Sequence, residues 1–165
     1  MEFIAKIKGL FSKTDTSEKS ASVTFYPKLI IVATYDFATS GIGLGSTKLT
    51  KLPVDISPEI LGQTLRKHFA LTQYNVEHPK DSKAFKKVFD DYKAAAGFKT
   101  NKDTYKDARE VGCRMTKTEI TLMPSENQYN TGYLPIPNSD IKLPLTISDN
   151  ELGLELLKAK EIATG

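Results

Sequence analysis

The chain has 165 residues, of which 39% are hydrophobic and 26% charged, a composition typical of soluble globular proteins. This length suits one domain with its own core, and no apolar run is long enough to span a bilayer. A single cysteine, Cys113, excludes an internal disulfide framework and a multi-cysteine zinc site. The net charge of +3 is mild, and most of the basic excess lies in residues 80–109.

Residues 1–22 are expected to form an N-terminal arm and a polar linker. Apolar and basic residues in Met1–Lys13 follow an amphipathic pattern, which predicts a helix that docks on the domain or frays, with membrane-surface binding as the alternative. The segment has no run of seven apolar residues, so it does not fit a secretory signal. Residues 14–22 are rich in Ser, Thr and Lys, as linkers are.

Two strands are expected next, at residues 23–26 and 29–35, and the second is apolar enough to be central in a sheet. The glycine-rich segment Gly41–Lys48 follows. It does not fit a phosphate-binding P-loop, because position 46 would have to be glycine followed directly by lysine, and Ser46 and Thr47 stand there. We therefore predict a twisted or bulged strand in this segment.

The chain contains an internal repeat with an offset of 91 residues. The segment 142–158 matches 51–67 without a gap, and nine of the seventeen positions are identical. The same offset lays the apolar run 29–32 over 120–123. One offset that holds over separated blocks indicates a duplication. We predict two related strand–loop–helix halves, at about 28–70 and 119–161.

Each copy of the repeat predicts a helix that begins after a serine. Ser57 is followed by proline, a residue favoured at the first helical position. Ser148 and Glu151 form the S-x-x-E capping box. Gly62 and Gly153 lie inside these helices, where glycine costs about 1 kcal/mol relative to alanine. We therefore expect both glycines to face closely packed backbone.

Between the two copies, residues 82–96 place apolar side chains at helical spacing, and Gly97 ends the pattern. Strands are expected to return at 111–115 and 118–123. The elements together predict an α+β fold, with one domain over residues 23–165 in which helices pack on a mainly antiparallel sheet.

Residues with catalytic chemistry are few. His68, His78 and Cys113 show no triad or metal-ligand spacing in the sequence, and a free cysteine inside a strand usually behaves as a small hydrophobe. No metal ion and no cofactor are expected. The sequence therefore favours a binding protein over an enzyme, with a small enzyme that uses these three residues as a rival hypothesis.

The chain closes on a Leu-Pro segment, 143–145, followed by an E-L-G-x-x-L-L-x-A helix, Glu151–Ala159. In these motifs, with the glycines of 41–45 as further support, the chain resembles the immunity proteins of bacterial contact-dependent growth inhibition systems. The resemblance implies a cytoplasmic antitoxin that forms a 1:1 complex with the C-terminal toxin domain, often a nuclease, of such a system. No homo-oligomer and no direct contact with nucleic acid are expected.

The alternative function is that of a nucleic-acid-binding protein that uses the lysine-rich segment 80–109, where nine basic residues face five acidic ones. Solvated helices with ion pairs along them explain this segment better. For the toxin we instead expect the loop-rich segment 124–140 as the contact surface, because loops on a rigid scaffold carry function. The alternative is a loop whose two tyrosines pack on the domain's own surface. The candidate partner-binding residues in it are two tyrosines and two carboxylates: Glu126, Tyr129, Tyr133 and Asp140.

Overall fold

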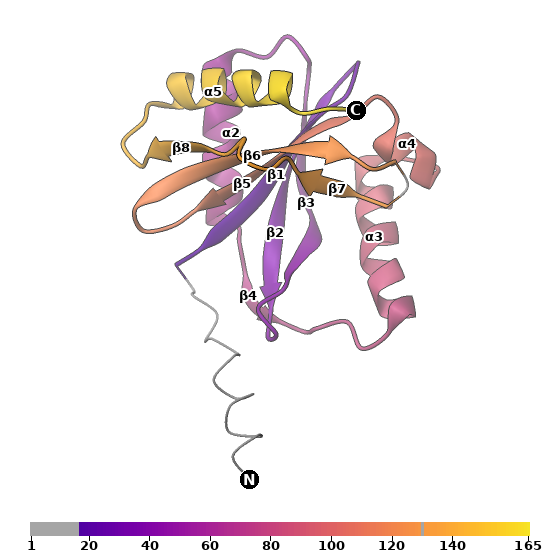
Figure 1. Ribbon diagram of the computed structural model, residues 1–165. Helices are drawn as coiled ribbons and strands as arrows, with labels where there is room; N and C mark the ends of the chain where they lie inside the picture. Colours follow the sequence, from indigo (N-terminus) through magenta and orange to yellow (C-terminus); the bar gives the residue numbers. More distant parts are fainter. Residues whose placement is uncertain (1–16, 130) are drawn as a thin grey trace.

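The computed structural model describes residues 17–129 and 131–165 and has helices packed on both faces of one eight-stranded sheet (Figure 1). The strands are β1 (Lys19–Phe25), β2 (Ile30–Ala38), β3 (Gly43–Leu52), β4 (Tyr74–Val76), β5 (Arg109–Met115), β6 (Glu119–Asn127), β7 (Tyr133–Pro135) and β8 (Ile141–Pro144). The helices in the described ranges are α2 (Pro58–Ala70), α3 (Ser82–Ala96), α4 (Asn101–Tyr105) and α5 (Asp149–Ile162).

The sheet has the order β3-β2-β1-β5-β6-β7, with β8 also paired to β6 and the short β4 paired to β2. The pairing of β4 with β2 is parallel, and the other pairings are antiparallel. The predicted α+β class, with a mainly antiparallel sheet and packed helices, is therefore confirmed. The predicted N-terminal helix at residues 1–13 lies outside the described residues.

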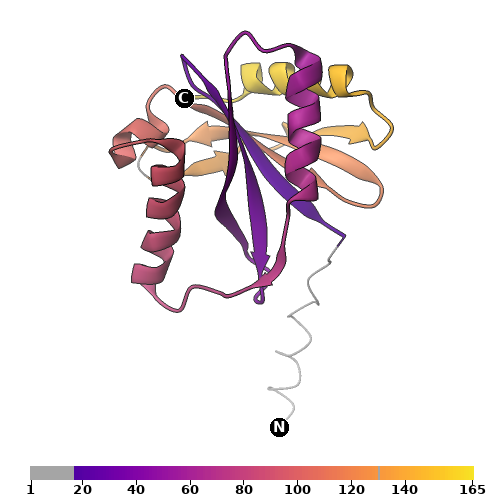
Figure 2. The ribbon, with the colours of Figure 1, turned by 180° about the vertical axis from the view of Figure 1, so that it is seen from behind.

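Helices α2 and α5 pack against each other and cover one face of the sheet (Figure 2). Side chains alternate between the two faces of a strand, so every second strand residue points toward these helices. The main core contains Val23, Val32, Val111, Leu122, Leu61, Leu65, Phe69, Leu152 and Leu156, all almost fully buried. On the opposite face, a smaller cluster of Ile31, Ala33 and Ala96 joins the sheet to α3.

The pairing of β2 with β3 recurs in the second half as the pairing of β6 with β7 and β8. Ile30 pairs with Leu52 in the first half, and Ile120 pairs with Leu143 in the second. Strand β2 is thus equivalent to β6 at an offset of 90, whereas Leu52 and Leu143 keep the offset of 91 that the helices have. The predicted superposition of 29–32 on 120–123 is wrong by one residue. A slip of one residue would turn every side chain to the other face, and only the observed register keeps both isoleucines in the core.

The two halves are related by a pseudo-twofold axis that crosses the sheet between β1 and β5. Ser22 of β1 pairs with Gly112 of β5, which is its own equivalent 90 residues later. The pairs on either side of this point reproduce each other, Phe25 with Arg109 and Met115 with Lys19. Self-complementary pairing of this kind is the geometry of a twofold dimer contact.

Both predicted helix starts are confirmed. The Ser57 side chain accepts a hydrogen bond from the Ile60 backbone N–H, with Pro58 at the first helical turn. Ser148 and Glu151 form a complete capping box at the start of α5. Equivalent positions therefore begin both helices, although the side chains that satisfy the first backbone N–H groups differ.

Gly62 and Gly153 form the crossing of α2 and α5. A Cβ on Gly62 would lie 2.0 Å from the carbonyl oxygen of Asp149, and a Cβ on Gly153 would lie 1.8 Å from that of Pro58. Asp149 is the equivalent of Pro58 at the offset of 91, so the two contacts are the same contact seen from the two halves. The expectation that these glycines face packed backbone is confirmed.

Two strand predictions need correction. β1 begins at Lys19 and not at residue 23, because Ser20, Ala21 and Ser22 pair with β2 on one edge and with β5 on the other. The segment 124–140 was expected to be loop-rich, but β6 continues to Asn127 and turns into β7. The predicted bulge in β3 is confirmed by a register shift against β2 between Ala33 and Tyr35.

Candidate partner-binding surface

The buried side chain of Asn127 ties the base of the hairpin between β6 and β7 to neighbouring segments of the domain. Its amide nitrogen donates to the carbonyl oxygens of Tyr105, at 2.6 Å, and Ala108, at 3.0 Å. Its amide oxygen accepts from the backbone N–H of Tyr129 at 2.9 Å. The backbone of Asn127 also donates to the carbonyl of Thr164. The base of this hairpin is therefore fixed by α4, by the residue before β5 and by the C-terminal segment.

Three of the four predicted contact residues present their side chains to solvent. Tyr129 lies in the turn of the hairpin with 60% of its surface exposed and a positive φ of 39°. Glu126 of β6 is exposed and pairs with Leu134, which is itself 56% exposed. Asp140 is exposed just before β8. These side chains offer an aromatic ring, an apolar group and two carboxylates on or near one hairpin.

Tyr133, the fourth predicted residue, has a different environment. It is half-buried, its ring centroid lies 5.5 Å from that of Tyr105, and its hydroxyl donates to the Thr104 carbonyl oxygen at 3.4 Å. Burial, with the negative charge of Glu110 as a smaller cause, raises the pKa of this phenol. Tyr133 therefore helps to line a cavity inside the domain, and the structure does not group it with Tyr129.

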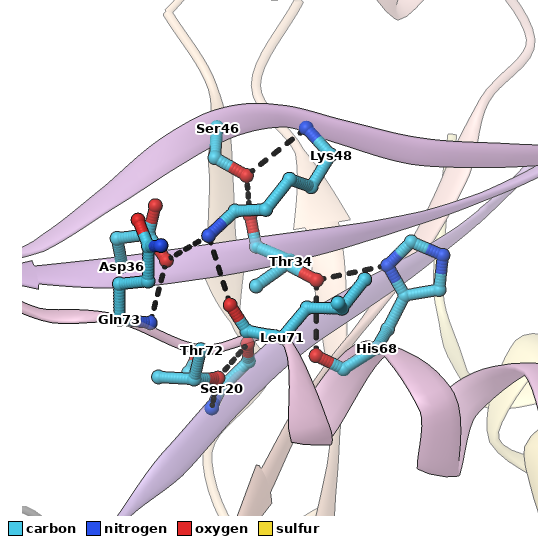
Figure 3. A network of polar contacts seen from close by, with 9 residues as sticks. All are labelled: Ser20, Thr34, Asp36, Ser46, Lys48, His68, Leu71, Thr72 and Gln73. Carbon is cyan, nitrogen blue, oxygen red and sulfur yellow. Dashed lines mark hydrogen bonds and ion pairs between the residues drawn. The ribbon is translucent and has the colours of Figure 1, made fainter.

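Both ring nitrogens of His68 form hydrogen bonds with threonine hydroxyls of the sheet. Nδ1 lies 2.8 Å from the Thr34 hydroxyl and Nε2 lies 2.9 Å from the Thr50 hydroxyl (Figure 3 shows the Thr34 contact). The Thr34 hydroxyl also donates to the His68 carbonyl oxygen. Burial, followed by the positive charge of Lys48, lowers the pKa of the ring. A neutral imidazole with both nitrogens occupied joins α2 to β2 and β3.

The same region contains a partly buried ion pair that fixes the end of α2 (Figure 3). The ammonium group of Lys48 lies 2.6 Å from Asp36 Oδ1 and donates to the Leu71 carbonyl oxygen at 2.8 Å. The same carboxylate oxygen accepts from the Gln73 backbone N–H at 2.8 Å. The ammonium group of the lysine that ends the glycine-rich segment is thus engaged by Asp36 and the Leu71 carbonyl oxygen.

The other residues with catalytic chemistry also have structural surroundings. Cys113 is fully buried in β5, and burial, with Glu110 as a smaller cause, raises the pKa of its thiol. The ring of His78 packs edge-on against Phe85, with centroids 5.4 Å apart. Among the described residues, no group of three or more His, Cys, Asp or Glu side chains is placed to hold a metal ion. Over the same residues, no helix is long and apolar enough to cross a membrane.

The lysines of α3 pair with carboxylates of their own helix. Lys86 lies 2.5 Å from Asp90, and Lys87 lies 2.5 Å from Asp91, both at i,i+4 spacing. Both lysine side chains are 73% exposed. Pairing along the helix, as the sequence predicts, lowers the positive charge that this surface presents.

Comparison with protein families matches residues 19–162 to the family model of the CDI immunity proteins. No curated protein matches the chain. Among solved structures, the chain is similar to a protein of unknown function from Neisseria meningitidis, with a TM-score of 0.79 and 21% identity over 93% of this chain and 98% of the other.

The chain is also similar to a chain of the CdiA-CT/CdiI toxin and immunity complex from Yersinia pseudotuberculosis. The TM-score is 0.75, with 16% identity over 88% of this chain and 97% of the other. At these identities the two structures show a common fold. The family match spans every strand and helix that the structure describes.

Proposed function

Because the chain belongs to the CDI immunity protein family, we propose that it binds and neutralises the C-terminal toxin domain of a contact-dependent growth inhibition effector. The family match over residues 19–162 is the observation that carries this proposal. The solved complex from Yersinia pseudotuberculosis, which has a chain of the same fold, is a toxin and immunity complex. We propose the same arrangement here, as a 1:1 complex formed in the cytoplasm.

Neutralisation is proposed to occur by binding, without turnover. His68 and Cys113 are occupied by packing and hydrogen bonds in the interior. An inhibitor that works by occupation must be present at least in equal amount to its target, whereas an enzyme would act at lower amounts. Titration of toxin activity with the purified protein is expected to reach an endpoint at one equivalent. Full inhibition well below one equivalent would refute binding as the mechanism.

The proposed contact surface is the hairpin between β6 and β7, with Tyr129, Glu126 and Asp140 as contact residues. Exposed aromatic rings on a rigid base lose little conformational freedom on binding and often anchor interfaces. The carboxylates would complement a cationic cleft, which is the reason to propose a nuclease as the toxin, since a nuclease must hold phosphate groups.

Calorimetric titration with the cognate toxin domain tests this surface. Tyr129→Ala is expected to weaken binding by about 2 kcal/mol, because an interface anchor contributes on this order. Charge reversal at Lys86 and Lys87 is the matched control and is expected to change the affinity little, because α3 is proposed to face away. Loss of binding in the lysine variant, with no change in the tyrosine variant, would assign the toxin contact to the surface of α3.

A further inference from the structure

A cavity of about 350 Å³ lies on the face of the sheet opposite α2 and α5. The strands β1, β2, β3 and β5 contribute to it, and α3, α4 and the start of β7 cover it. Ile42 and Phe85, which are 49% and 43% exposed, belong to its lining and mark where it reaches the surface. The proposed contact residues Glu126, Tyr129 and Asp140 do not line this cavity.

The carboxylate of Glu110 borders the cavity from β5. Glu110 pairs with Thr24 across the β1–β5 ladder, and the Thr24 hydroxyl lies 3.5 Å from Oε2, a long hydrogen bond. Within residues 17–129 and 131–165, no basic side chain forms an ion pair with Glu110. Burial raises the pKa of this carboxyl to about 7, while the Thr24 bond opposes the shift. The hydrogen bond from Thr24 thus offsets only part of the free-energy cost of removing the Glu110 carboxylate from bulk water.

Tyrosine rings form much of the remaining wall. They come from five different segments of the chain: Tyr26, Tyr35, Tyr92, Tyr105 and Tyr133. Each of these phenols has a raised pKa, with burial or the charge of Glu110 as the largest cause. They are therefore neutral at physiological pH, and their ring faces carry partial negative charge. Aromatic faces around one carboxylate attract a positive charge.

The chemistry of the lining excludes other classes of ligand. An anion would be repelled by the carboxylate of Glu110. A divalent metal ion needs several oxygen or nitrogen ligands, and among the described residues only one carboxylate lines the cavity. A purely apolar ligand would displace water from Glu110 without replacing its hydrogen bonds. An organic cation satisfies both the carboxylate and the rings.

We propose that this cavity binds an alkylammonium or guanidinium group, with Glu110 as its counter-ion and the tyrosine rings as its walls. Two sources carry this chemistry: a free small amine, and a lysine or arginine side chain of the toxin. The second source rests on the proposed function, whereas the first does not.

The test is calorimetric titration of the full chain at pH 8 with n-butylammonium chloride, and in parallel with 1-butanol, which replaces the ammonium group by a hydroxyl. Saturable binding of butylammonium at one site is expected, with much weaker binding of butanol. Glu110→Gln keeps the shape of the side chain and is expected to weaken butylammonium binding roughly thirtyfold, as loss of one partner of a buried charge pair does. Glu77→Gln, an exposed carboxylate with 77% of its side chain accessible, is the matched control and is expected to bind like the unchanged protein.

The affinity is also expected to fall about tenfold from pH 8 to pH 6, because the carboxylate becomes protonated while butylammonium stays charged. The groups that face Glu110 from β1, β2, α3, α4 and β7 are Thr24 and the five tyrosines, none of which changes charge in this range. Arg109, beside it on β5, pairs with Glu161 of α5.

Tyr105→Leu gives a second variant that keeps the carboxylate and an apolar wall. It is expected to weaken butylammonium binding more than butanol binding, because only the cation gains from the ring face. Circular dichroism and thermal melts establish that each variant is folded. The proposal is overturned if butylammonium does not saturate a site, or if Glu110→Gln and the unchanged protein bind it equally.

The toxin domain distinguishes the two sources. If a toxin side chain enters the cavity, saturating butylammonium and Glu110→Gln both weaken toxin binding. If the natural ligand is a free amine, toxin affinity is unchanged by either. Failure of the protein to bind any toxin would refute the proposed function and leave the amine titration to decide the cavity on its own.

Discussion

The crossing of α2 and α5 allows a quantitative test of the packing. Gly62→Ala would place a Cβ 2.0 Å from the Asp149 carbonyl oxygen, and Gly153→Ala would place one 1.8 Å from the Pro58 carbonyl oxygen. Ordinary contacts of this type are longer by more than 1 Å, and the neighbours are helix backbone. The helices must therefore move apart, and the buried leucines at their interface lose contact.

The expected size follows from two opposing effects. Alanine is favoured over glycine within a helix by about 1 kcal/mol. Overpacking of a tight interior site typically destabilises by about 1–3 kcal/mol, and backbone atoms yield less than side-chain ends. Because the neighbours here are backbone, we take the upper end of this range, about 3 kcal/mol, less the gain of about 1 kcal/mol, and expect each single substitution to lower the free energy of unfolding by about 2 kcal/mol. Because Gly62 and Gly153 lie at the same crossing, the double variant is expected to lose less than the two single losses added together.

Urea denaturation followed by circular dichroism measures these changes. Gly45→Ala is the matched control, since a Cβ there meets nothing within 4 Å, and its effect is expected to stay below about 0.5 kcal/mol. If either helix variant is as stable as the unchanged protein, the helices do not pack as closely as described. Strict additivity in the double variant would mean that the two contacts are independent, against the twofold arrangement.

Three further predictions concern single side chains. Glu110→Gln is expected to remove a pH dependence of stability. Because the folded-state pKa of Glu110 is raised, the free energy of unfolding of the unchanged protein falls by up to about 3 kcal/mol as pH rises from about 4.5 to above 7. If urea melts give the same difference in stability between the two proteins at pH 5 and at pH 8, this prediction is wrong. His68→Ala is expected to destabilise by about 1–3 kcal/mol, because the hydroxyls of Thr34 and Thr50 lose a buried partner, while toxin binding by the folded fraction is retained; an unchanged melting temperature would refute the structural role. Ser148→Ala is expected to lose about 1 kcal/mol through its capping box, and equal stability would show that the end of α5 frays.

Local rules predicted the parts of the fold that local contacts determine. The serines at 57 and 148 begin helices because their hydroxyls satisfy backbone N–H groups within the same turn. The glycines were predictable because the repeat placed them at one position in both helices. The hairpin of β6 and β7 was not predicted, because the many Pro, Asn and Gly residues of segment 124–140 are typical of a loop. Its pairing instead depends on the neighbouring strand β5, whose Val111 pairs with Pro124.

The cavity could not be predicted from sequence, because its parts are far apart in the chain. Glu110 lies just outside the predicted strand 111–115. A charged residue that extends this strand and faces the interior would be the signal in the sequence for a polar cavity. The tyrosines around it come from both halves and from the segment between them. Of the predicted contact residues, Tyr133 turned inward because Leu134, its neighbour in β7, occupies the outward side.

The pseudo-twofold axis implies that each half of this fold carries surfaces that only another half can cover. One half on its own would expose the free edge of its first strand, β1 or β5, and the helix face that contains Gly62 or Gly153. Both surfaces are complementary to themselves, so two separate halves would assemble as a homodimer whose population depends on concentration. Joining the halves in one chain replaces that association by an intramolecular step with a high effective concentration. Within one chain the two halves can differ. The α3–α4 segment follows the first half only and lies over the cavity, and the second half has β7 and β8 in place of one outer strand.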